Sequence, residues 1–238
     1  MSPVRYPVVE LRQYTLRPGQ RDVLIDLFDR EFVESQEADG MAIVGQFRDL
    51  DDPDRFTWIR GFASMPARAR ALASFYGGPV WKAHSAAANA TMIDSDNVLL
   101  LRPVTARSGF PPPAGHAPAA PSRVLVTLYY RDRPFDQAFA DFVDRQARPV
   151  LTEAGATPLA CLQTKHAENT FPALPVRTGE NVFAWLARFR SPALLDDHLR
   201  QIERSAEWRD SVLPALSSLI TGSAQQLRLA PTARSQLR

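Results

Sequence analysis

Apolar and polar side chains alternate from residue 8 to residue 16 of the chain. Val9 and Leu11 fall on one side of this stretch, and Glu10, Arg12 and Tyr14 fall on the other. A period of two residues is typical of a β-strand, and Pro18-Gly19 is expected to end it.

Residues 17–101 predict two helical segments and three further strands. Residues 21–33 carry apolar side chains at helical spacing, and residues 41–47 and 56–63 are expected to form a hairpin. Ser64 is expected to cap a helix that Gly77-Gly78-Pro79 divides into two pieces. A strand over residues 98–101 completes the order β-α-β-β-α-β.

The same order is predicted a second time. Trp58 and Trp81 are separated by 23 residues, and so are Trp185 and Trp208. Strands are expected over residues 124–130, 156–164, 182–190 and 225–229, with helical segments between them. Both halves therefore have the element order of a ferredoxin-like unit, an antiparallel sheet with its helices on one face.

Two such units can pack their open sheet faces together and close a barrel. We therefore expect an α+β fold in which two tandem ferredoxin-like repeats form an intrachain dimeric-α/β-barrel-type structure. The expected divisions are a first repeat over residues 1–104, a Pro-rich linker over 105–122, a second repeat over 123–230 and a flexible tail over 231–238.

The composition gives no indication of a nucleic-acid-binding or membrane-spanning protein. The formal net charge is +2, which gives no reason to expect nucleic acid or an anionic membrane as a partner. No segment has the run of about 20 apolar residues that a membrane span needs. The single cysteine, Cys161, cannot form an intrachain disulfide and is expected to be a small buried hydrophobe. A cytoplasmic location is the expectation from these features.

Candidate chemistry follows from the faces of the strands. If Val9 and Leu11 pack on the helices, Glu10, Arg12 and Tyr14 face the interior of the barrel. Trp58, Arg60 and Phe62 also share one strand face. An aromatic wall with one or two arginines suits a flat molecule that carries a carboxylate, enolate or carbonyl. These six residues are thus candidate ligand contacts, with Arg12 or Arg60 holding the anionic oxygen and Tyr14 as a catalytic hydrogen-bond donor.

A structural salt-bridge network that includes Glu10 and Arg12 is the alternative interpretation of the same residues. His84 is a candidate general base because the ordinary pKa of histidine is close to neutral, and a histidine on the helix surface is the alternative. Arg60 is matched by Ala187 in the second half and His84 by Ser211, so the expected site lies in the first half.

Other signatures are absent from the sequence. It has no phosphate-binding glycine loop, no Gly-x-Ser-x-Gly, no Cys-x-x-Cys and no His-Glu-x-x-His. Arg68 and Arg70 are expected on a solvated helix face. The run Asp94-Ser95-Asp96-Asn97 is expected to be a turn, and His116 falls in the linker. No metal ligand set and no tightly bound cofactor are therefore predicted.

The chain is similar to the NIPSNAP family in Val9-Glu10-Leu11-Arg12-Gln13-Tyr14-Thr15-Leu16-Arg17-Pro18-Gly19, in the Trp58 strand, in Trp81-Lys82-Ala83-His84 and in Ala87-Ala88-Asn89-Ala90-Thr91-Met92. The resemblance is specific over residues 8–104 and weaker over 122–230. It implies a dimeric α/β barrel, whose relatives include cofactor-free monooxygenases, isomerases and haem-degrading proteins. The family has no agreed reaction, and its animal members are linked to vesicle or mitochondrial roles.

Three functions are compatible with this picture. The first is the binding of a small, partly apolar anionic or carbonyl-bearing molecule in a barrel cavity, with cofactor-free isomerisation or oxygenation as its chemistry. The second is a non-catalytic binding or scaffolding protein that self-associates as a homo-oligomer. The third is haem binding with His84 as the axial ligand. Whether the chain is an enzyme is left open by the sequence.

Overall fold

The computed structural model describes residues 5–111 and 121–238. Its first half comprises β1 (Val8–Leu16), α1 (Arg21–Leu27), η1 (Phe28–Phe32), α2 (Val33–Ala38), β2 (Ala42–Asp49), β3 (Arg55–Phe62), α3 (Met65–Gly77), α4 (Pro79–Thr91) and β4 (Met92–Pro103). Its second half comprises β5 (Arg123–Arg131), α5 (Gln137–Phe142), η2 (Val143–Ala147), α6 (Arg148–Glu153), β6 (Thr157–Thr164), β7 (Asn181–Phe189), α7 (Pro192–Arg204), η3 (Trp208–Val212), α8 (Leu213–Leu219) and β8 (Gln225–Pro231). The order β-α-β-β-α-β thus occurs twice.

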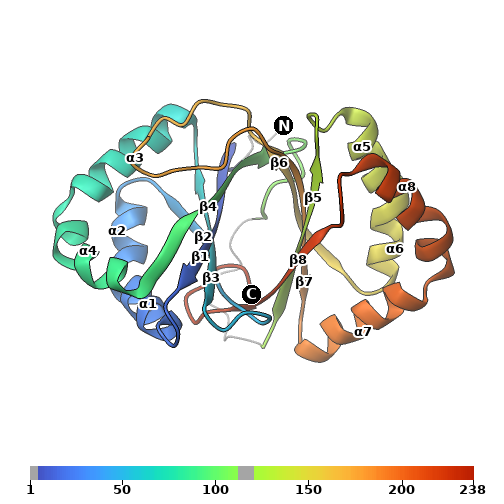
Figure 1. Cartoon of the computed structure of the whole chain (residues 1–238), viewed down its shortest axis with the longest axis horizontal. Helices are drawn as coiled ribbons and strands as arrows, with labels where there is room; N and C mark the ends of the chain where they lie inside the picture. The colour runs from blue at the N-terminus through green and yellow to red at the C-terminus, as the bar shows by residue number, and fades with distance from the viewer. Residues whose placement is uncertain (1–4, 112–120) are drawn as a thin grey trace.

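The strands of both halves form one closed antiparallel barrel in the order β1-β3-β2-β8-β5-β7-β6-β4. The helices of the first half lie outside one side of the barrel, and those of the second half lie outside the opposite side (Figure 1). This arrangement confirms the predicted intrachain barrel. Two seams join the halves, and each consists of three paired positions, between β2 and β8 and between β4 and β6.

The helices α3 and α7 begin directly after serine residues that cap them. The Ser64 hydroxyl accepts a hydrogen bond from the Ala67 amide at 3.1 Å, and the Ser191 hydroxyl accepts one from the Leu194 amide at 3.3 Å. Such caps satisfy amide groups that have no partner within the first helical turn. The five-residue π-helical segments η1, η2 and η3 each link two α-helical segments, so three of the expected helices continue through a wider turn.

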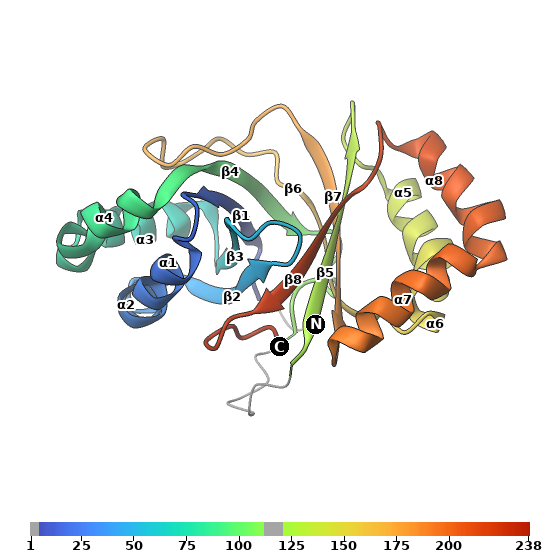
Figure 2. The ribbon, with the colours of Figure 1, turned by 60° about the horizontal axis from the view of Figure 1, so that its bottom comes forward.

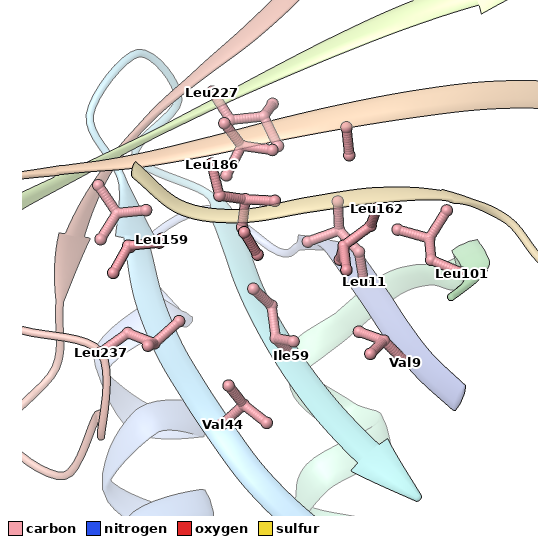
Figure 3. Packing of buried hydrophobic residues seen from close by; sticks show 14 of the residues in the cluster. Val9, Leu11, Val44, Ile59, Leu101, Leu159, Leu162, Leu186, Leu227 and Leu237 are labelled. Carbon is pink, nitrogen blue, oxygen red and sulfur yellow. The ribbon is translucent and has the colours of Figure 1, made fainter. Parts of the chain in front are cut away.

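Apolar side chains fill the barrel interior. Val9 and Leu11 of β1 belong to this cluster together with residues from both halves, and Figure 3 shows Val44, Ile59, Leu162, Leu186 and Leu227 gathered between the strands. A second apolar cluster lies between β1–β4 and the first-half helices, and a third lies between β5–β8 and the second-half helices. The described residues therefore form three apolar cores, one inside the barrel and one under each layer of helices.

This distribution corrects the predicted faces of β1 and β3. Tyr14, Trp58 and Phe62 belong to the cluster under the first-half helices, whereas Val9 and Leu11 lie inside the barrel. The side chains on both faces of β1 are buried, because helices cover its outer face and the barrel closes over its inner face. Alternation alone consequently could not tell which face is the inner one.

Residues 165–180 connect β6 to β7 and extend over the first half, near α3 (Figures 1 and 2). The Lys165 amide donates to the Leu100 carbonyl and the Arg177 amide to the Val98 carbonyl, both at 2.9 Å. Phe171 and Leu174 pack against the apolar cluster under the first-half helices. A segment of the second half thereby covers part of the first.

Two local expectations are wrong. Residues 94–97 belong to β4, which begins at Met92 and pairs irregularly with β1, and the Asp96 amide donates to the Asp94 carboxylate within it. The tail after Pro231 is packed: the Ser235 side chain is buried, and Leu237 is 7% exposed within the barrel cluster. Over the described residues, no helix is long and apolar enough to cross a membrane.

Candidate functional site

The residues predicted from β1 and β3 come together as a buried group between the sheet and the first-half helices. Glu10 and Arg60 are directly paired across the two strands, as are Arg12 and Trp58. All four side chains are at most 2% exposed. The predicted neighbours are therefore brought together, but outside the barrel interior.

Glu10 is the centre of this group, which we call the Glu10 cluster and define as Glu10, Arg12, Arg60 and Arg68. The Glu10 carboxylate accepts hydrogen bonds from Arg12 Nη1 at 2.7 Å, Arg60 Nε at 2.7 Å and Arg68 Nε at 2.6 Å. Three guanidinium groups and one carboxylate leave two positive charges unbalanced in a region without solvent contact.

Burial alone raises the pKa of the Glu10 carboxyl, but the charges of Arg60, Arg12 and Arg68 outweigh it and hold this pKa well below its usual range. The carboxylate is consequently ionised across the physiological pH range. Charged groups with hydrogen-bond partners can be retained in a protein interior, whereas leaving one unpaired is costly.

Tyr14 and the aromatic rings complete the surroundings of the cluster. The Tyr14 hydroxyl accepts a hydrogen bond from Arg12 Nε at 3.0 Å, and burial raises the pKa of this phenol, so it keeps its proton. The guanidinium carbon of Arg60 lies 5.0 Å from the ring centre of Trp58 and 5.5 Å from that of Phe62. Such cation–π contacts partly compensate the charge of a desolvated arginine.

Sequence reasoning missed two members of this environment. Arg68 of α3, expected to be solvated, is 0% exposed, whereas the neighbouring Arg70 is exposed as expected. Gln36 of α2 is 1% exposed, and its side-chain oxygen accepts from Arg60 Nη1 at 3.1 Å. A positional signal for Arg68 was available: it lies four residues after the Ser64 cap, on the turn of α3 that faces the sheet.

His84 lies on α4, outside the Glu10 cluster. Its Nε2 atom is 3.4 Å from a carboxylate oxygen of Glu31, and its side chain is 33% exposed. Its ring also lies 6.4 Å from that of Phe32. The catalytic and haem-ligand roles suggested for His84 stay predictions.

The space beside the Glu10 cluster is small. A cavity of about 30 Å³ is lined by Tyr14, Trp58, Gln36 and the rings of Tyr76 and Trp81, among others. That volume suits one or two water molecules, and a drug-sized ligand needs roughly ten times more.

A much larger cavity, of about 530 Å³, lies in the second half between the sheet and the helical layer of α5, η2 and α6. Its apolar wall includes Val143, Leu159, Phe183 and Trp185. The polar residues at this cavity are Thr105, Arg107, Ser108, Gln137, Asp141, Asp144, Arg148 and Cys161. The cavity combines a flat aromatic wall with a few charged groups, which is the usual composition of a small-molecule site.

Electrostatics at this cavity are nearly balanced. Arg148 pairs with Asp144 at 2.6 Å and Arg145 with Asp141 at 3.7 Å. In the part of the chain that the structure describes, the guanidinium of Arg107 has no ion pair. Burial raises the pKa of the Cys161 thiol to about 12, with Arg148 opposing and Asp144 adding to the effect. Cys161 is therefore a protonated thiol at neutral pH and only partly buried, unlike the buried residue expected from the sequence.

The two halves differ at equivalent strand positions. Where the first half pairs Glu10 with Arg60, the second pairs Leu125 with Ala187. Where the first half pairs Arg12 with Trp58, the second pairs Thr127 with Trp185. The second half thus lacks the buried ion pairs at these positions, and its helical layer covers an apolar floor.

No group of three or more His, Cys, Asp or Glu side chains within the described ranges is arranged to hold a metal ion. His116 lies outside those ranges. The contacts above therefore describe two places of interest, the Glu10 cluster in the first half and the large cavity in the second.

Comparisons with known proteins bear on the family and the fold. The NIPSNAP family model matches residues 9–106. No curated protein is significantly similar to the chain. A protein of Fusobacterium nucleatum subsp. nucleatum ATCC 25586, provisionally named a monooxygenase, has a similar structure with a TM-score of 0.61 at 10% identity, covering 95% of this chain and 92% of that one.

Two further solved structures are similar over nearly the whole chain. One is a protein of Lactobacillus acidophilus NCFM, also provisionally named a monooxygenase, with a TM-score of 0.57 at 12% identity and coverage of 95% of this chain and 94% of that one. The other is an anthrone oxidase-like protein, with a TM-score of 0.59 at 11% identity and coverage of 97% and 94%. At these identities the similarity establishes a shared fold.

Proposed function

With a NIPSNAP domain spanning residues 9–106, we propose that the chain binds a small, partly apolar molecule with a carbonyl or anionic group, and that this ligand occupies the large cavity of the second half. The observation that carries the proposal is the cavity of about 530 Å³ between the sheet and the α5–η2–α6 layer. Small-molecule sites usually have volumes of about 300 to 1,000 Å³.

The lining supports this class of ligand. Phe183 and Trp185 offer aromatic surface, and Val143 and Leu159 extend the apolar wall. Two of the residues at the cavity are arginines, and among the described residues Arg148 is paired with Asp144, whereas Arg107 has no ion pair. A carboxylate or polarised carbonyl on the ligand is the natural partner for its guanidinium.

The sequence predicted a ligand site in the first half, whereas the ligand proposed here occupies the second half. Of the six residues expected to contact the ligand, Tyr14 and Trp58 line a cavity of about 30 Å³, which is too small for an aromatic molecule. The side chains of Glu10, Arg12, Arg60 and Phe62 are buried and do not line it. We propose that this network chiefly stabilises the first half, which was the alternative interpretation of Glu10 and Arg12.

A cofactor-free oxygenation is a second candidate. Its support is the full-length fold similarity to proteins named as a monooxygenase and as anthrone oxidase-like. Cys161 at the cavity is protonated at neutral pH and can donate a hydrogen bond, but it cannot serve as a base in that state. Dioxygen uptake in the presence of anthrone is the measurement that decides for or against this chemistry.

Filling the cavity tests the binding proposal. Ala140 of α5 lines the cavity, so Ala140→Phe should weaken the binding of 2-naphthoate, used here as a fused-ring carboxylate, by at least about tenfold, which corresponds to 1.4 kcal/mol. Isothermal titration of the purified full chain gives the two dissociation constants.

Ala87→Phe is the matched control, because Ala87 is exposed on α4 in the other half. It should leave the affinity for 2-naphthoate unchanged. Equal affinity of the wild type and Ala140→Phe, or no binding of any fused-ring carboxylate by the wild type, contradicts the proposed site.

A further inference from the structure

The Glu10 cluster carries more positive charge than its own residues neutralise. Arg12, Arg60 and Arg68 are each 0% exposed, and they share the single carboxylate of Glu10. Removing an ion from water costs several kcal/mol unless a counter-charge and hydrogen bonds replace the water. Two of the three cations therefore lack a counter-charge in the cluster itself.

The Glu10 cluster and its surroundings also contain hydrogen-bond donors without a partner. The Nη2 atoms of Arg60 and Arg68 and the Nε1 atom of Trp58 are buried and have no partner among the described residues. The side-chain amide of Gln46, a residue paired across the strands with Trp58, also has no partner, but it is neutral. An excess of buried donors together with an excess of positive charge calls for an anionic acceptor.

Neutral groups of residues 165–180 cover this side of the cluster. Arg68 Nη1 donates to Asn169 Oδ1 at 3.0 Å and to Thr170 Oγ1 at 3.3 Å. Phe171 of the same segment stacks on Tyr76, with ring centres 5.9 Å apart and planes inclined by 28°. Asn169 and Thr170 hence supply oxygen acceptors to Arg68 without supplying charge.

We propose that the first half holds a small oxyanion, of the carboxylate class, beside Arg60 and Arg68, and that the 165–180 segment is the lid of this site. The oxyanion takes the position at Arg68 that the Asn169 side-chain oxygen occupies in the closed arrangement. This site is separate from the large second-half cavity, and it takes ions such as formate rather than fused-ring molecules, since the ion replaces a single side-chain oxygen beside two fully buried arginines.

The lid has the features of a movable segment. It contains neither helix nor strand between Thr164 and Asn181, and it is held on the first half by hydrogen bonds and by the packing of Phe171 and Leu174. Loops of this length without regular structure are uncommon and are often functional. Lifting the lid exposes Arg68 first, because Arg68 is the cluster member that contacts it.

Asn169→Asp tests the proposal by building a carboxylate into the lid at the same position and with nearly the same shape. In the wild type, sodium formate should raise Tm saturably by about 3 °C or more above an equal concentration of sodium chloride. In Asn169→Asp the specific response to formate should be lost, whereas its Tm without formate reflects both the gained charge pairing with Arg68 and the lost donation from Asn169 Nδ2 to the Leu174 carbonyl.

Two further variants complete the test. Asn89→Asp adds the same charge at an exposed position of α4 and should keep the wild-type formate response. Ala140→Phe should also keep it, so failure of the second-half site and failure of this one are distinguishable. A formate response that does not saturate, or one of equal size in Asn169→Asp, overturns the proposal.

Arg68→Met gives an independent readout. It removes one of the unbalanced cations and should abolish the formate response, while crystals of the wild type grown in formate should show the ion within hydrogen-bond distance of Arg60 or Arg68. If Arg68→Met does not fold, the formate response of the wild type compared with that of Asn169→Asp still tests the proposed oxyanion site.

Discussion

At the scale of residues, the Glu10 carboxylate is the group on which the first-half interior depends. Arg12, Arg60 and Arg68 all donate to it at 2.6–2.7 Å. Removing one partner of a buried ion pair usually costs more than the pair contributes, because the remaining charge is left without compensation. Here a single substitution removes the shared partner of three cations.

Glu10→Gln should therefore lower the free energy of unfolding by about 3–5 kcal/mol at pH 7. The pKa of Glu10 is depressed in the folded state, so its contribution is fully present above the unfolded pKa of about 4.3 and is lost as pH falls below it. Urea unfolding at pH 7 and pH 3.5 checks both statements. The difference between the wild type and Glu10→Gln should shrink at the lower pH.

Glu203→Gln, at an exposed position of α7, serves as the control and should change stability by less than about 0.5 kcal/mol. A Glu10→Gln variant as stable as this control would show that the three arginines are compensated by something other than Glu10.

The sequence correctly predicted which residues of β1 and β3 lie together. It did not predict on which face of the sheet their side chains lie. Glu10, Arg12 and Arg60 were expected together, and they are. Their placement inside the barrel was wrong because both faces of β1 are buried, so alternation has no solvent side to refer to. Arg68 was missed because an arginine in an Ala/Arg-rich helix is usually solvated, although its spacing from Ala71, Leu72 and Phe75 places it on the buried face of α3.

At the scale of elements, the helix starts follow local chemistry closely. Ser64 precedes Met65–Gly77 and Ser191 precedes Pro192–Arg204, and both serines accept a hydrogen bond from an amide three residues later. The wider turns η1, η2 and η3 were not predicted, since a π-helical turn changes the spacing of apolar residues by only one position.

Ser64→Ala should lower the free energy of unfolding by about 1 kcal/mol, because the Ala67 amide loses its acceptor. Ser64→Asp should restore most of this loss, since aspartate is also a good cap. Chemical denaturation of the three proteins measures the effect, and equal stability of Ser64→Ala and the wild type would show that the cap does not stabilise α3.

At the scale of the whole molecule, the last residues of the chain belong to the barrel. Leu237 is 7% exposed within the interior cluster, and the Ser235 hydroxyl accepts from the Gln46 amide at 3.2 Å. The tail was expected to be loose because it has few apolar residues. Leu237 nevertheless packs in the barrel cluster, and the Arg234 and Gln236 side chains donate hydrogen bonds to Glu34 and Glu37.

Leu237→Ala should lower the free energy of unfolding by about 2–3 kcal/mol, as expected for a buried leucine. Leu213→Ala, at a side chain that is 43% exposed, should cost clearly less. Thermal and urea unfolding of both variants measure the two changes in the free energy of unfolding. Equal decreases would place Leu237 outside the cooperative core.

The architecture itself could be predicted from the sequence, because the twofold recurrence of the Trp58 and Trp185 strands and of the element order requires two similar units. The large cavity could not, since it depends on how far the α5–η2–α6 layer stands from β6 and β7. Such spacing is decided by packing between distant segments and leaves no periodic signal.

The two short seams of the barrel have one more consequence. Each half is a complete strand-and-helix unit, and the strands of the two halves pair with one another at β2–β8 and β4–β6. Those pairings are identical whether the two halves belong to one chain or to two chains that have exchanged them. Exchange of halves between molecules therefore conserves every strand pair of the barrel and gives this fold a route to an intertwined dimer without any new interface.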